Sequence, residues 1–76
     1  MALNIAMLRD HLAMADRHVA SGNLVVTRQR QLIAKLEADS HDTTEALALL
    51  ARFEDLLAQH LAHRDNLADE LKSAEV

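Results

Sequence analysis

The feature that most constrains this chain is an apolar pattern with spacings of three and four residues, interrupted only once. This spacing keeps each series on one stripe of a helix and suits left-handed packing between helices. We therefore expect two long helices that pack along these stripes. The first series is Ile5, Leu8, Leu12, Ala15, Val19, Gly22, Val26, Gln29, Ile33 and Leu36, and the second is Ala46, Leu50, Phe53, Leu57, His60, Arg64, Leu67, Leu71 and Ala74.

The interruption is the polar stretch at residues 39–44. Asp42 followed three residues later by Glu45 resembles a capping box, with an acid in place of Ser or Thr. Two helices joined by a short turn lie antiparallel. We predict one all-α domain over residues 1–76, an antiparallel two-helix hairpin of coiled-coil type. Its helices span about 3–39 and about 43–74, and its turn about 40–42.

The composition supports this fold class and excludes others. The chain has no Cys, no Pro, one Gly and one aromatic residue, whereas Ala and Leu each occur 14 times. Without Cys there is neither a disulfide framework nor a thiolate zinc site. The scarcity of β-branched, aromatic and turn residues argues against a β sandwich or barrel.

Gly22 allows a rival arrangement with a second break and three helices, because Gly costs a helix interior roughly 1 kcal/mol relative to Ala. The apolar stripe keeps its phase across Gly22, which favours one continuous helix. Folding the chain about residue 41 then pairs Gly22 with His60 and Arg30 with Glu54. Polar Gln29 and Arg64 fall in the seam, where such residues often fix register.

A lone hairpin leaves further apolar side chains beside the seam. Exposed apolar patches of this kind usually mark interfaces, so we expect self-association, most simply a homodimer of two hairpins forming a four-helix bundle. The relative orientation of the hairpins stays open. The expected interface residues are Met7, Met14, Val25, Leu32, Leu49 and Leu56.

Five His residues raise the hypothesis of a metal site. The predicted register gathers His18, His60 and His63, with His11 and Glu70 two turns further along. Zinc or a similar divalent transition metal takes three or four such nitrogen and oxygen ligands. The alternative is structural: His60 fills the room beside Gly22, and the other three His line a wet rim.

The net charge and the sequence motifs limit the classes of function that this chain can have. The net charge of −4 works against nucleic-acid binding. No segment is apolar enough to span a membrane or to act as a signal peptide, so we expect a cytoplasmic protein. No enzyme motif is present. We expect a non-enzymatic, self-associating interaction module whose protein partner is unknown, and a His-based metal-binding bundle is the alternative.

A further pattern covers most of the chain and includes His18-Val19, Arg28-Gln29-Arg30, His41-Asp42-Thr43, Leu49-Leu50, Phe53-Glu54, His60 and His63-Arg64-Asp65. In these residues the chain resembles a family of small bacterial helical proteins without an established activity. The resemblance implies a helical hairpin. That family often has Gly before the His-Asp-Thr turn, where this chain has Ser40.

Overall fold

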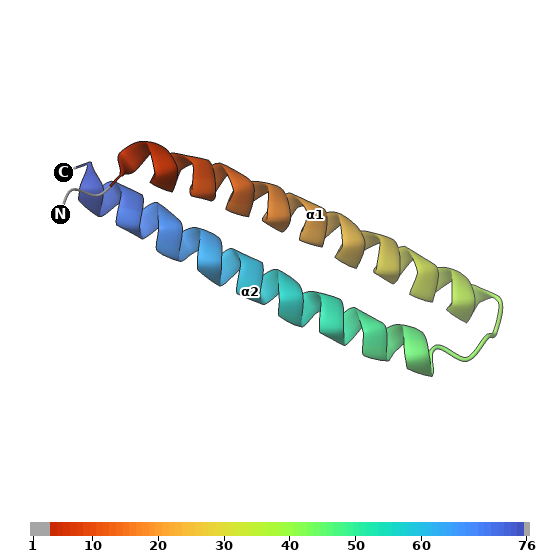
Figure 1. The fold of residues 1–76 in the computed structure, drawn as a ribbon. Helices are drawn as coiled ribbons and strands as arrows, with labels where there is room; N and C mark the ends of the chain where they lie inside the picture. The colour runs from red at the N-terminus through yellow and green to blue at the C-terminus, as the bar shows by residue number, and fades with distance from the viewer. Residues whose placement is uncertain (1–3, 76) are drawn as a thin grey trace.

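The computed structural model describes residues 4–75, which fold into two antiparallel helices packed side by side (Figure 1). Helix α1 spans Ile5–Ala38 and helix α2 spans Thr44–Ala74. The described chain is all-helical, and its Cα atoms extend over 59 × 14 × 14 Å. The connection at residues 39–43 is two residues longer than the expected turn. The expected helix start at residue 3 lies outside the described residues.

The two apolar series form the seam between the helices, as their spacing predicts. Every member of both series is buried or half-buried. The seam is nevertheless thin, because no side chain in the described part of the chain is less than 2% exposed. The most buried residues are Ala15, Val19, Val26, Gln29 and Ile33 of α1 and Leu67 of α2.

Helix α1 continues through Gly22 without a break, so the three-helix arrangement is wrong. Gly22 marks a close approach of the two helices. A Cβ atom at this position would lie 3.1 Å from Cδ1 and 3.8 Å from Cα of Leu57. The missing side chain therefore lets the α2 backbone and Leu57 come close to α1.

The predicted register is correct at one pair and wrong at another. Arg30 and Glu54 face each other at 3.9 Å, as expected. Gly22, however, contacts Leu57 rather than lying directly opposite His60. The reason is that a side chain in such a seam packs into a hole between residues of neighbouring layers. Pairing residues at equal distances from residue 41 assumes that each residue lies directly opposite its partner, so it misses this offset.

The ends of α1 are held by local hydrogen bonds. At its start, the Asn4 side chain accepts a hydrogen bond from the Met7 amide at 3.0 Å, a cap that the sequence reading missed. At its end, the Ser40 amide donates to the Glu37 carbonyl and the His41 amide to the Leu36 carbonyl. These two bonds define a Schellman motif, with Ser40 in the left-handed region at φ 59°.

Helix α2 begins one residue later than a capping box at Asp42 requires. Thr43 is the N-cap residue and makes no side-chain capping bond. The Asp42 carboxylate instead accepts from the Thr44 amide at 3.0 Å and from the Thr44 hydroxyl at 2.7 Å. Asp side chains commonly bond the backbone two residues ahead, so the predicted capping box is replaced by this shorter-range turn.

Candidate functional site

The two broad faces of the hairpin differ in chemistry. One face carries the Arg9–Glu75 ion pair at 2.6 Å and the Arg30–Glu54 ion pair at 3.9 Å. The two arginines are 21 residues apart, as are the two glutamates, so both pairs follow the same side of each helix. All four side chains are between 41% and 64% exposed, and each pair therefore adds little to the free energy of unfolding. We call this side the ion-paired face.

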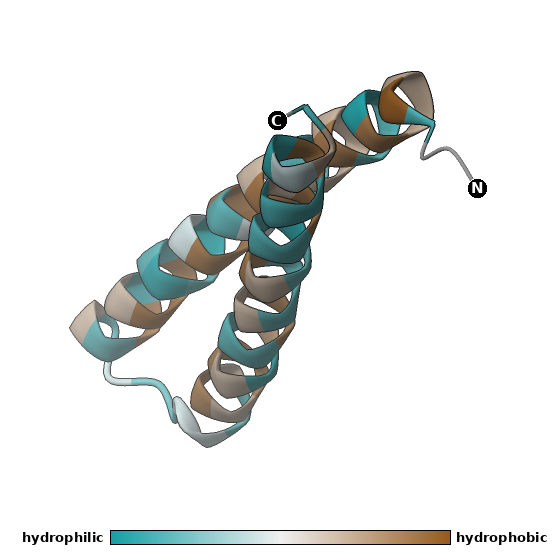
Figure 2. Cartoon of the chain, turned by 90° about the vertical axis from the view of Figure 1, so that its left-hand side faces the viewer, coloured by the Kyte–Doolittle hydropathy of each residue, from teal (hydrophilic) through white to brown (hydrophobic). Residues whose placement is uncertain are grey.

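The opposite side, here the hydrophobic face, carries the six apolar residues expected at an interface. Each of the six is between 39% and 52% exposed. They form three pairs, each seven residues or two turns apart, so each pair shares one helix side. Figure 2 shows hydrophobic and hydrophilic residues alternating in bands along both helices. The pairs are Met7 with Met14, Val25 with Leu32, and Leu49 with Leu56.

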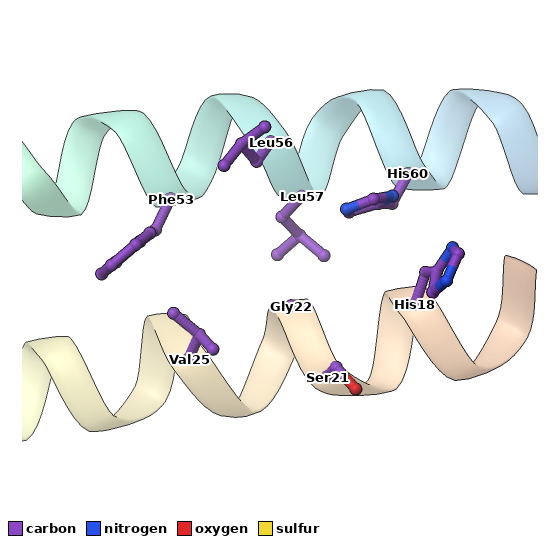
Figure 3. A pocket seen from close by; sticks show the side chains of 8 residues that line it. All are labelled: His18, Ser21, Gly22, Val25, Phe53, Leu56, Leu57 and His60. Atoms are coloured by element: carbon purple, nitrogen blue, oxygen red, sulfur yellow. The ribbon is translucent and has the colours of Figure 1, made fainter.

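A hollow of about 250 Å³ lies in the hydrophobic face (Figure 3). Gly22 belongs to its lining, and Leu57 packs against Gly22 from the other helix. The only sequence signal for the hollow was a glycine at a seam position. Its lining comes from both helices: His18, Ser21, Gly22 and Val25 of α1, and Phe53, Leu56, Leu57 and His60 of α2.

At one end of this hollow, His18 and His60 meet across the two helices. Their ring centres are 5.4 Å apart, and their ring planes are tilted by 49°. His60 is a half-buried seam residue, whereas His18 is exposed on the hydrophobic face. Figure 3 shows both rings at the same end of the hollow, beyond Gly22 and Leu57.

A second hollow adjoins the first through His18. His11, Met14, His18 and His63 line it together with Ala15. The two hollows therefore hold the four His residues expected at a metal site. Glu70 lines neither of them. Within residues 4–75, no three His, Asp or Glu side chains lie close enough together to hold one ion.

Two of the polar seam residues, Gln29 and Arg64, have clear partners. Gln29 is only 7% exposed, and its Nε2 donates to the Ala46 carbonyl oxygen at 2.9 Å. This bond ties the second half of α1 to the first turn of α2. Arg64 is half-buried and pairs with the neighbouring Asp65 at 3.0 Å. Its charged group thus reaches the edge of the seam while its stem packs inside.

Comparison of the chain with known protein families, with curated proteins and with solved structures found no match. The resemblance to small bacterial helical proteins therefore stays a prediction. Neither α1 nor α2 has the length and apolar character needed to cross a membrane.

Proposed function

We propose that this protein is a non-enzymatic helical module that associates with a second copy of itself through the hydrophobic face. Two hairpins related by a two-fold axis then form a four-helix bundle. The observation that carries this proposal is the amount of surface that a single hairpin leaves exposed.

The hairpin exposes 5768 Å² of surface. A compact monomer of its mass, 8.4 kDa, exposes about 4,600 Å². The excess of about 1,200 Å² is larger than the roughly 800 Å² that each partner buries in a standard stable interface. A second copy is a fitting occupant, because it has the same length and the same unpartnered apolar stripe.

The contrast between the two faces indicates which side the second copy covers. The ion-paired face already satisfies its charges in water, and its burial would require removing water from Arg9, Arg30, Glu54 and Glu75. Covering the hydrophobic face removes mainly apolar surface from water, which contributes about 25 cal/mol per Å². The hydrophobic face is thus the side that gains from association.

Two leucines of α2 provide a matched test. Leu56 is 50% exposed and lines the central hollow, whereas Leu47 is 48% exposed. They are nine residues, or two and a half turns, apart and so point to opposite sides of α2. We expect Leu56→Glu to weaken self-association at least tenfold, because it buries a charge in the interface. Leu47→Glu is expected to leave association nearly unchanged.

Sedimentation equilibrium of the full chain, from 1 to about 200 µM and in the presence of EDTA, measures both effects. The proposal predicts a dimer for the wild-type chain and for Leu47→Glu, and a monomer or a much weaker dimer for Leu56→Glu. A wild-type monomer throughout this range would overturn it, as would equal weakening by the two substitutions.

A further inference from the structure

We propose that His18 and His60 form half of an intermolecular metal site, which the same pair from a second copy completes. The ion would be a divalent transition metal of the zinc type, held by four imidazoles at the dimer axis. This inference rests on the proposed self-association through the hydrophobic face.

The position of the pair along the rod supports this assignment. The midpoint of Ile5–Ala38 falls between Ser21 and Gly22, and the midpoint of Thr44–Ala74 falls at Gln59. His18 and His60 are therefore within about one helical turn of the middle of both helices. When two equal rods overlap fully, the middle of one lies against the middle of the other, whether they run parallel or antiparallel. The two His pairs are then brought to the same level.

The geometry of the pair fits two ligands of one ion. Zinc binds His nitrogen at about 2.0–2.1 Å with tetrahedral angles, which places the centres of two imidazoles on the same ion roughly 5 Å apart. The ring centres of His18 and His60 are 5.4 Å apart, and their tilt excludes face-to-face stacking. Binding of a shared ion then requires that the side-chain torsions direct one nitrogen of each ring toward the same point.

The surroundings of the pair also suit a metal ion. The pair lies at one end of the hollow, whose other lining residues include apolar Val25, Phe53 and Leu56, and a second copy on the hydrophobic face would close this hollow. Two imidazoles fill half of a tetrahedral shell, and the two-fold axis supplies the other half. Imidazole nitrogen is a good ligand for zinc, nickel and copper, and the net charge of −4 per chain favours binding of a cation.

The test is a titration of the full chain with Zn²⁺ after removal of metal by EDTA and dialysis. Calorimetry is expected to give one Zn²⁺ per two chains, and Co²⁺ in its place is expected to give the visible absorption of a tetrahedral site. If zinc binds only the dimer, free zinc at 100 times its dissociation constant lowers the apparent dimer dissociation constant about 100-fold.

Four variants locate the site. His18→Gln and His60→Gln are expected to weaken Zn²⁺ binding at least tenfold and to remove the effect of zinc on the dimer. His41→Gln, in the connection between the helices, and His11→Gln, in the adjoining hollow, are matched controls that should retain both. Dimers of all variants in EDTA would show that the substitutions leave the metal-free association intact.

Three results would overturn the inference. They are the absence of Zn²⁺ binding by a dimeric wild-type chain, a stoichiometry of one Zn²⁺ per chain, and unchanged binding in His18→Gln and His60→Gln. Each of these leaves the proposed self-association standing. A chain that is monomeric in EDTA overturns the self-association driven by apolar burial, and a dimer that then forms only with Zn²⁺ still supports the metal site.

Discussion

At the residue scale, Ser40 is held in a conformation that its side chain disfavours. Its φ of 59° lies in the left-handed region, which costs an L-residue about 1–2 kcal/mol. The conformation persists because two hydrogen bonds from Ser40 and His41 satisfy the last carbonyls of α1. Gly is the usual residue at this position of a Schellman motif, because it has no Cβ to strain.

We therefore predict that Ser40→Gly raises the free energy of unfolding by about 0.5–1 kcal/mol, the relief of strain minus the greater freedom of Gly in the unfolded chain. Urea unfolding at one fixed protein concentration measures the change. The control is Ala34→Gly, at an exposed position inside α1, which should instead lose about 1 kcal/mol. A loss of stability in Ser40→Gly would contradict the left-handed assignment.

At the element scale, the start of α2 depends on Asp42. The hydrogen bond from the Thr44 hydroxyl, and next the bond from the Thr44 amide, hold the pKa of the Asp42 carboxyl below its ordinary value. Because the folded pKa is lowered, the stabilisation from these bonds is present above the unfolded pKa. It is lost as the pH falls through the folded pKa, so acid weakens the start of the helix.

Replacing Thr44 by Val tests this cause directly. We expect Thr44→Val to raise the pKa of Asp42 toward its ordinary value, with part of the shift remaining because the backbone amide still donates. Thr43→Val is the control, because Thr43 makes no side-chain capping bond. An NMR titration of the Asp42 carboxyl carbon measures the pKa in each variant, and an equal shift in both would refute this explanation.

The close approach of α1 and α2 at Gly22 leads to a second prediction, on how substitutions of Gly22 change the free energy of unfolding. Gly22→Ala adds about 1 kcal/mol of helix propensity, and its Cβ displaces only the terminal Cδ1 of half-buried Leu57 by a few tenths of an ångström. We expect a net gain of about 0.5 kcal/mol. Gly22→Leu overfills the seam and should lose about 1–3 kcal/mol.

Chemical denaturation of both Gly22 variants at one protein concentration measures the change in the free energy of unfolding. It shows whether helix propensity or packing against Leu57 dominates this change. Asn23→Ala calibrates the propensity term, because Asn23 is an exposed neighbour in α1. A gain in stability with Leu would mean that the helices are not in close contact at this point.

At the scale of the whole molecule, the hairpin is a thin rod with little interior. Its seam is one layer of side chains, and among the described residues none is fully buried. A single small core of this kind usually supplies only about 3–5 kcal/mol. If the second copy completes the core, unfolding and dissociation occur together, and stability depends on protein concentration.

We accordingly predict that the melting temperature of the wild-type chain rises by a few degrees for each tenfold increase in concentration, since a tenfold change is worth about 1.4 kcal/mol. Circular dichroism melts over a 100-fold range measure this dependence. Leu56→Glu should melt at a lower temperature that varies little with concentration. A constant wild-type melting temperature would exclude coupled unfolding and dissociation.

The sequence by itself determined the secondary structure and the seam. Residues spaced three and four apart fall on one stripe of a helix. This spacing therefore predicted both helices, the continuity of α1 through Gly22 and every buried or half-buried seam position. The same register also predicted that His18 and His60 lie together. Tertiary structure decided the layer offset that places Leu57 on Gly22 and the position of the hollow. These depend on how two surfaces interlock in three dimensions, and a periodic pattern along one chain fits several such offsets equally well.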